Sequence, residues 1–505
     1  MELAFAIVLM TSVKAVPPLD LCHLEAFLVG TEHWFRKRYR PLYHLSAPYG
    51  WFNDPAAFVF YKRQYHLFYQ CHPYDGSWGP MRWEHAATAD LVHWAHYPPA
   101  LLPRDAYDRQ GCLAGSAVRH NGLLLFYTGR ARSGNDTVHT HSLAVSADAV
   151  LFRKYMFNPL VRAAPTIADG ARNPKVWRHR NVWYMLVGAS RERSGQLLLY
   201  TSPDLYSWQY NGTVARSVGD MGYAWESPDL FELEGLCVLL LSAQGVREDG
   251  DRFRNLMQTG YVLGNYDCLS VRLGDLEVST ATFEELDRGH DFYAAKTMRA
   301  VDGRRLLVAW LGMWNGQFAE ARNGWVGCMT LVRELRLGRH GRLLQAPVRE
   351  MAGLRSKLIE NAWYSPGESF PAGAKGFELL VNATSAEQDV GLALQWDGGD
   401  YVISYRAARG VLSVDRGGVD GVRRADWAPA GHLRLRIFVD RSSVEVFCGA
   451  GEVVFSSRIY PRGKVLVRIA GQSQLHFTQY GLEPSIGYDQ KVTEYIKKDI
   501  LNMTK

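Results

Sequence analysis

A short motif that returns three times at nearly equal spacing is the feature of this 505-residue chain that most restricts its fold. Ala89-Asp-Leu-Val-His-Trp94 recurs as Pro203-Asp-Leu-Tyr-Ser-Trp208, and a weaker copy, Ala147-Asp-Ala-Val-Leu-Phe152, lies between them. The aspartates of the three copies are 58 and 56 residues apart. A period near this value suits one four-stranded blade of a β-propeller, and about 300 residues of this character predict roughly five blades. Chance similarity between turn motifs is the alternative.

Short strands, and not helices, dominate the pattern around these motifs. Between residues 43 and 340, runs such as Leu123-Leu-Leu-Phe-Tyr127 are apolar and aromatic and are bounded by Gly, Asn and Asp. Strand patterns resume near residue 376, and several, such as Leu433-Arg-Leu-Arg-Ile-Phe438, alternate with period two, as half-exposed sheets do. The chain is therefore predicted to be all-β, with a five-bladed β-propeller followed by a β-sandwich.

These patterns divide the chain into five predicted parts. They are a signal peptide at residues 1–15, the propeller at 40–345, a linker with some helix at 346–365, the β-sandwich at 366–483 and a C-terminal tail at 484–505. The first part is a short apolar run that ends in Val13-Lys-Ala15 and is too short to span a bilayer. We therefore expect a secreted protein. Four Asn-x-Ser/Thr sequons agree with secretion, at Asn135, Asn211, Asn382 and Asn502.

The charge and the cysteine content argue against several kinds of partner and site. The formal net charge is +6, but the basic residues are scattered, and the tightest cluster, at residues 36–40, accompanies no recognised nucleic-acid fold pattern. Neither nucleic acid nor a membrane is predicted as a partner. The seven cysteines show no CxxC pair and no zinc pattern. The oligomeric state and the disulfide pairing stay open.

The residues around Asp54 mark its carboxylate as a candidate functional group. Trp51-Phe-Asn-Asp-Pro55 comes just before a strand-like run, so an Asn-Asp-Pro turn there would place Asp54 at the mouth of a sheet. Pro55 has a fixed φ and favours an extended conformation at Asp54, which helps to hold the carboxylate in place. Tyr65-His-Leu-Phe-Tyr-Gln70, Trp78-Gly79 and the first copy of the repeat follow in order.

This ordered series resembles the glycoside hydrolase family of β-fructofuranosidases, which includes invertases, inulinases and levanases. The resemblance covers roughly residues 40–480. It implies a secreted retaining β-fructofuranosidase that acts on sucrose or short β-fructans. Its partner would be a small-molecule or oligosaccharide fructoside. No cofactor is implied, because two carboxyl groups suffice for this chemistry.

The resemblance also assigns roles to individual residues. It implies that Asp54 is the nucleophile and that Glu226, in Trp225-Glu-Ser-Pro-Asp229, is the general acid and base. A retaining mechanism needs these two carboxyl groups about 5–5.5 Å apart: one attacks the anomeric carbon, and the other protonates the leaving oxygen and then activates water. The implied substrate-binding residues are Asn53, Gln70, Trp78, Arg172, Tyr293 and Lys296.

The chain departs from the family pattern at a critical position. Arg172-Asn173-Pro174 stands where the family has Arg-Asp-Pro, whose Asp stabilises the developing positive charge of the fructosyl unit. Asn173 can still donate and accept hydrogen bonds, but it supplies no negative charge. The loss of one such contact typically costs about 2.7–4 kcal/mol. The alternative is therefore a catalytically impaired homologue that binds fructosides or retains only the fold.

Overall fold

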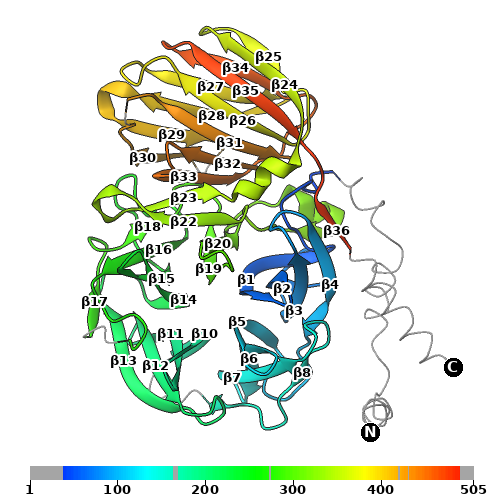
Figure 1. The fold of residues 1–505 in the computed structure, drawn as a ribbon, viewed down its shortest axis with the longest axis vertical. Coiled ribbons are helices and arrows are strands. Elements are labelled where there is room, and N and C mark those ends of the chain that lie inside the picture. The colour runs from blue at the N-terminus through cyan, green and yellow to red at the C-terminus, as the bar shows by residue number, and fades with distance from the viewer. Residues whose placement is uncertain (1–37, 163–168, 272–274, 419–420, 430, 489–505) are drawn as a thin grey trace, which may run out of the picture.

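The computed structural model describes residues 38–488 except 163–168, 272–274, 419–420 and 430. The described chain forms a ring of five β-sheets around one axis, and a two-sheet sandwich sits against one side of this ring (Figure 1). The predicted all-β class, with a five-bladed propeller followed by a sandwich, is confirmed. The predicted signal peptide and the tail beyond residue 488 lie outside the described residues. No helix in the described part is long and apolar enough to cross a membrane.

Each blade of the propeller is an antiparallel sheet whose first strand is innermost (Figure 1). The first blade contains β1 (Gly50–Tyr61), β2 (Gln64–His72), β3 (Arg82–Thr88) and β4 (Trp94–Leu101). The second contains β5 (Gly111–Arg119), β6 (Leu123–Ser133), β7 (Asp136–Ser146) and β8 (Arg153–Lys154), with β9 (Val161–Arg162) beside β7. The third contains β10 (Asp169–His179), β11 (Val182–Arg191), β12 (Ser194–Ser202) and β13 (Gln209–Ser217).

The last two blades complete the ring. The fourth contains β14 (Ala224–Leu233), β15 (Leu236–Gln244), β16 (Met257–Gly264) and β18 (Glu284–Glu285), while β17 (Leu276–Val278) pairs in parallel with β13 of the third. The fifth contains β19 (Tyr293–Arg299), β20 (Arg305–Trp310), β22 (Arg333–Leu337) and β23 (Leu343–Pro347). Between β20 and β22, η2 (Ala319–Asn323) precedes β21 (Trp325–Val326), which pairs with β1 and so joins the last blade to the first.

The sequence repeat corresponds to one turn between the third and fourth strands of three blades. Asp90, Asp148 and Asp204 each accept backbone N–H bonds from the residues two and three positions later, at 2.7 to 3.1 Å. The residue after each aspartate has a positive φ, at Leu91, Ala149 and Leu205. Aspartate satisfies the turn's amides through its own side chain, which explains why it recurs there.

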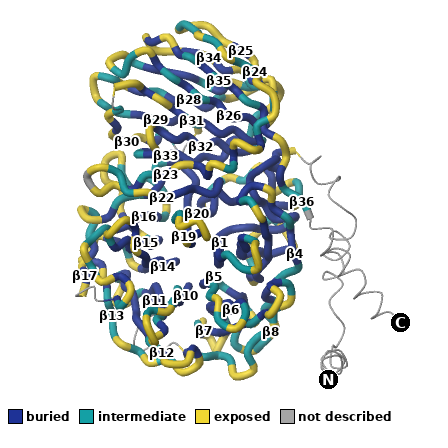
Figure 2. Tube along the Cα trace, viewed as in Figure 1, coloured by how far each residue is buried: buried dark blue, intermediate teal, exposed yellow. Residues whose placement is uncertain are grey.

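Apolar packing between neighbouring blades holds the ring together, since their sheets share few hydrogen bonds. Separate clusters of buried side chains fill the five interfaces, and the cluster between the fifth and first blades extends to Phe438 of the sandwich. Figure 2 shows the inner strands as largely buried and the outer turns as exposed. The inner strands are thus held rigidly around the axis.

The sandwich consists of two six-stranded antiparallel sheets with an apolar core between them. One sheet contains β24 (Arg355–Tyr364), β35 (Leu475–Leu482), β26 (Phe377–Ala383), β31 (Arg434–Asp440), β32 (Ser443–Cys448) and β33 (Val453–Arg458). The other contains β25 (Ser369–Pro371), β34 (Leu466–Gly471), β27 (Val390–Trp396), β28 (Gly399–Arg406), β29 (Val411–Asp415) and β30 (Val422–Asp426). The remaining short helices are η3 (Arg339–Gly341), η4 (Arg349–Leu354) and η5 (Ala407–Arg409).

Two segments differ from the expected boundaries. In the predicted linker at 346–365, η4 is followed by β24, which is an edge strand of the sandwich paired with β35. Half of its residues are polar, none is buried, and polar and apolar residues do not alternate along it. In the predicted tail at 484–505, β36 (Ile486–Tyr488) returns to the first blade and pairs in parallel with β4. Both segments become strands because their backbones pair with strands that are distant in sequence. Such pairing leaves no local pattern in the sequence.

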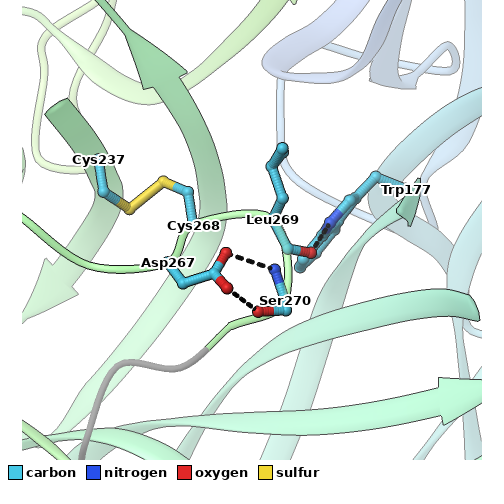
Figure 3. Close-up of a disulfide and its surroundings, with 6 residues drawn as sticks. All are labelled: Trp177, Cys237, Asp267, Cys268, Leu269 and Ser270. Carbon is cyan, nitrogen blue, oxygen red and sulfur yellow. Dashed lines mark hydrogen bonds between the residues drawn. A yellow bond between two sulfur atoms is a disulfide. The ribbon is translucent and has the colours of Figure 1, made fainter. Parts of the chain in front are cut away.

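One disulfide lies on the fourth blade (Figure 3). It joins Cys237 of β15 to Cys268, in the loop that follows β16. In the same loop, the Leu269 carbonyl accepts a 3.1 Å hydrogen bond from Trp177 Nε1 of the third blade. The other described cysteines are buried free thiols, at Cys71, Cys112, Cys328 and Cys448.

A buried ionic network joins the propeller to the sandwich. Arg333 of β22 has no exposed surface, and its Nη1 donates to Asp287 at 2.9 Å. Its Nη2 reaches Glu445 of β32, whose other oxygen lies 3.0 Å from His44 Nε2. His44 also contacts Asp440, which accepts backbone N–H bonds from residues 42 to 44. Charges buried in this way are tolerated only because each has a partner.

Arg333→Met should lower the free energy of unfolding by about 3–5 kcal/mol, because it leaves two buried carboxylates without their cation. Arg336→Met is the matched control on the same strand. The Arg336 side chain is 69% exposed and pairs with Glu334 alone among the described carboxylates, so the effect should stay below about 1 kcal/mol. Urea unfolding of both variants measures the difference. Equal losses would show that the network contributes no more than a surface ion pair.

Candidate active site

All five innermost strands are irregular at the end where the predicted site residues lie. Each loses register with its neighbouring strand, at residues 52–57 of β1, 113–115 of β5, 169–175 of β10, 226–229 of β14 and 293–296 of β19. A bulge adds a residue to one strand and redirects the side chains beside it. Five bulges around one axis therefore turn several side chains toward a common centre.

Three of these bulges contain a non-glycine residue with a left-handed backbone. Asn173, Ser227 and Ala294 have φ values of 62°, 47° and 55°. Such values are uncommon for residues with a Cβ and cost about 1–3 kcal/mol each. Each of the three directly follows a predicted site residue: Arg172, Glu226 and Tyr293. The surrounding blades hold the strained backbone in place and so fix the direction of these side chains.

Asp54 is a buried carboxyl group with one unpartnered oxygen. It is 3% exposed, and its Oδ1 has no hydrogen-bond partner in the described part of the chain. Burial, followed by the nearby charge of Glu226, raises the pKa of Asp54 to about 7. A hydrogen bond from Asn53 and the charges of Lys296 and Arg172 act in the opposite direction. The two predicted catalytic carboxyl groups therefore share one electrostatic environment.

Glu226 is held by two donors from neighbouring strands. Arg172 Nε donates to Glu226 Oε1 at 3.0 Å, and Arg172 Nη2 and Gln244 Nε2 reach the same oxygen. Arg172 Nη1 donates to the Gly170 carbonyl at 2.9 Å, which fixes the guanidinium group within its own bulge. Arg172 is predicted to contact substrate, and its carboxylate partner in the structure is Glu226.

Asn173 is buried beside Glu226 but bonds to other residues. Its backbone N–H donates to Thr128 Oγ1 at 3.0 Å, and its Nδ2 donates to Ser227 Oγ at 3.2 Å. These bonds tie the third blade to the second and the fourth. The amide thus occupies a fixed position within the axial site.

Lys296 and Tyr293 of β19 complete the charged centre. Lys296 is buried, and its Nζ has no hydrogen-bond partner among the described residues. Burial lowers the pKa of Lys296 to about 8, against the charges of Asp229, Asp54 and Glu226. Burial and the charges of Glu226 and Asp54 also raise the pKa of Tyr293 well above its ordinary value. Both residues are therefore within electrostatic range of the two carboxyl groups.

Gln70 and Trp78 lie on the first-blade side of the site. Gln70 is buried, and its Oε1 accepts a 3.2 Å bond from the Ala114 N–H at the bulge of β5. Trp78 lies in the loop after β2 and is 42% exposed, with the Arg130 guanidinium carbon 5.1 Å from its ring centroid. The charge of Arg172 contributes to lowering the pKa of Arg130, so this pair is near the site. Neither Gln70 nor Trp78 bonds directly to Asp54 or Glu226 in the described structure.

Gln244 is the functional residue that the sequence did not reveal. It ends β15 and lies opposite Ala224 in the ladder with β14. Its side chain reaches Glu226 across the bulge of β14. No motif marks it, because only the strand pairing brings it to the axis.

Two interacting carboxyl groups lie at the axis of a five-bladed propeller, with buried cations beside them, and glycoside hydrolysis requires such a pair of carboxyl groups. Residues 44–347 match the glycosyl hydrolases family 32 N-terminal domain, and residues 354–482 match the family 32 C-terminal domain. The chain belongs to glycosyl hydrolase family 32. The predicted resemblance and enzyme class are thus confirmed, and the protein is a glycoside hydrolase of the β-fructofuranosidase type.

The chain is similar to individual relatives along most of its length. Raffinose invertase of Escherichia coli is 39% identical over 436 residues, which cover 84% of this chain and 90% of that protein. Sucrose-6-phosphate hydrolase of Zymomonas mobilis is 38% identical over 452 residues, which cover 83% and 87%. The solved structure of the Bombyx mori family 32 beta-fructofuranosidase has a TM-score of 0.86 and 38% identity, and the match covers 93% of this chain and all of that one.

Asp54→Asn should stabilise the protein at high pH. The folded-state pKa of Asp54, about 7, lies above its ordinary value of 3.8, so its favourable contribution is present at acid pH and is lost as pH rises through 7. We expect the melting temperature of the variant to exceed that of the wild type by a few degrees at pH 8, and the gap to close toward pH 4.

Asp204→Asn provides a control of opposite sign. Backbone hydrogen bonds lower the pKa of Asp204 to about 2, and the bond from Ser207 has the largest effect. Removal of the ionised carboxylate should therefore destabilise the protein above pH 4. Thermal unfolding at several pH values measures both variants. A pH-independent gap for Asp54→Asn would contradict the raised pKa.

Proposed function

We propose that this protein is a retaining β-fructofuranosidase that hydrolyses sucrose or short β-fructans, with Asp54 as nucleophile and Glu226 as acid and base. The observation that carries this proposal is that these two carboxyl groups meet in one buried axial site, where the charge of Glu226 acts on Asp54. The relatives support the substrate: a variant of the Bombyx mori enzyme has been solved in complex with sucrose, and the Escherichia coli relative is a raffinose invertase.

The hydrogen bonds of the site suit the two proposed roles. Asp54 Oδ1 is unpartnered and can attack the anomeric carbon of the fructosyl unit. As this bond forms, the bond to the glucosyl oxygen breaks, and Glu226 gives that oxygen its proton. The donors from Arg172 and Gln244 converge on Glu226 Oε1, which leaves Oε2 for the leaving group. Glu226 then takes a proton from water, whose oxygen bonds to the anomeric carbon and releases Asp54.

The neighbouring cations keep the nucleophile usable. Asp54 must be ionised to attack, but burial favours its neutral form. Lys296 and Arg172 oppose burial, because their charges lower the pKa of Asp54. In this role Lys296 acts on the nucleophile from the fifth blade and Arg172 from the third.

Release of fructose from sucrose by the purified protein is the test of this function. We expect release by the wild type and by Glu387→Ala, an exposed control in the sandwich, and none above background from Asp54→Ala or Glu226→Ala. With methanol as acceptor, the methyl fructoside formed should keep the β configuration, and an inverted product would exclude Asp54 as nucleophile. No release by folded wild-type protein would favour the alternative, an impaired homologue.

We further propose that Asn173 weakens the enzyme, because a carboxylate there would stabilise the positive charge that develops on the fructosyl unit. Asn173→Asp should then raise kcat/KM on sucrose at least about tenfold. Steady-state kinetics beside Asn181→Asp, an exposed position in the turn between β10 and β11, separates this effect from a change in net charge. An unchanged or lower rate would mean that a third buried carboxylate disfavours ionised Asp54 more than it assists the reaction.

We propose secretion as well, on the basis of the Cys237–Cys268 disulfide and the apolar first residues of the sequence. Disulfides form and persist in oxidising compartments, which agrees with an extracellular enzyme. N-terminal sequencing of protein recovered from the medium of expressing cells tests this point. Recovery only inside the cells, with both thiols reduced, would contradict it.

A further inference from the structure

A second cavity opens at the other end of the propeller axis from Asp54. Its volume is about 1590 Å³, and we call it the rear cavity. Its walls come from the C-terminal parts of all five innermost strands, at residues 58–60, 117–119, 175–178, 230–233 and 297–299. The inner strands therefore run from the axial site at one end to the rear cavity at the other.

A buried polar layer separates the rear cavity from the axial site. Asp229 of β14 accepts bonds from Thr297 N at 2.9 Å and Thr297 Oγ1 at 2.8 Å, and Lys175 Nζ lies 2.8 Å from its other oxygen. Lys175 and Thr297 line the rear cavity, whereas the next residue, Lys296, faces the charges of Asp54 and Glu226. A ligand in the rear cavity would therefore not occupy the substrate site.

The rear cavity carries an excess of positive charge. Seven lysine or arginine side chains line it, against three glutamates. Three of the seven are neutralised: Lys175 by Asp229, Arg304 by Glu350 and Asp302, and Arg336 by Glu334. The other four have no carboxylate partner in the described structure, and they are Arg119, Arg178, Arg299 and Arg305.

Arg305 is the most buried of these four groups. Its guanidinium carbon lies 4.2 Å from the ring centroid of Phe231, and its only hydrogen bond in the described structure is a 3.5 Å contact from Nη1 to Thr297 Oγ1. A guanidinium group has five N–H donors, so most of them are unused. Burial lowers the pKa of Arg305, and the charge of Arg299 adds to this effect, although Asp229 opposes it. Arg299 and Arg305 lie opposite each other in the ladder between β19 and β20, and both line the rear cavity.

We propose that the rear cavity is a binding site for a phosphate-type oxyanion, held by Arg299 and Arg305. Guanidinium groups match the oxygens of a phosphate through paired N–H bonds, and a partly buried site strengthens such bonds. The ligand would be inorganic phosphate or the phosphate group of a sugar ester. This site is independent of the proposed catalytic function, because it uses neither Asp54 nor Glu226.

Calorimetric titration of the full-length protein in phosphate-free buffer at constant ionic strength tests the site. The titrants are inorganic phosphate, glucose 6-phosphate and, as a neutral control, glucose. We expect saturable one-to-one binding of at least one phosphate compound and none of glucose. Arg299→Gln/Arg305→Gln should weaken this binding about tenfold or more. Arg468→Gln, an exposed sandwich position, should leave it unchanged.

Further variants and controls test where the anion binds and whether the phosphate group is recognised. Arg299→Gln alone should also weaken binding, and because Arg299 is exposed, this variant answers the question even where the double variant fails to fold. Binding that is lost in Arg130→Gln but kept in Arg299→Gln would place the anion at the mouth of the axial site and overturn the proposal. Absence of saturable binding, or equal binding of glucose and glucose 6-phosphate, would overturn it as well.

Discussion

The geometry of this protein depends on the convergence of five strands that cannot all pair with one another. The innermost strand of each blade has its ladder on one side, and only β1 gains a short second partner, β21, on the other. Where these strands approach the axis, each bulges and departs from its neighbour's register. Because apolar clusters hold the blades in place, the bulges can keep strained residues such as Asn173 without relaxing.

This convergence has an electrostatic consequence. It brings two carboxyl groups, Asp54 and Glu226, into a space where neither is well solvated, so their charges disfavour each other. Arg172 and Lys296 stand beside them and balance the pair. Asn173 in place of an aspartate keeps a third negative charge out of this space.

The same inner strands carry different sets of charged side chains at the two ends of the propeller axis. At one end carboxyl groups and cations are matched, whereas at the other the arginines outnumber their partners. Asp229 separates the two ends, and it interacts with Lys175 on one side and Lys296 on the other. The sandwich adds rigidity from outside the ring, through the buried contacts of Arg333 with Asp287 and Glu445.

Much of this architecture could be predicted from local sequence, because it rests on local physics. Each aspartate of the repeat accepts hydrogen bonds from the backbone amides of its own turn. The regular spacing of these aspartates therefore predicted the blades. Trp51-Phe-Asn-Asp-Pro55 and the segment around Glu226 identified the two carboxyl groups, because their motifs are contiguous. Such features can be predicted from the sequence because the residues that form them are close together in the chain.

Other features were decided only by the tertiary structure. Gln244 reaches Glu226 because β15 pairs with β14, and residues 355–364 form a strand because β35 offers an edge. The partner of Cys237 and the raised pKa of Asp54 likewise depend on groups far away in the sequence. Burial and charge act through space, so their effect on each side chain exists only once the five blades have closed around the axis.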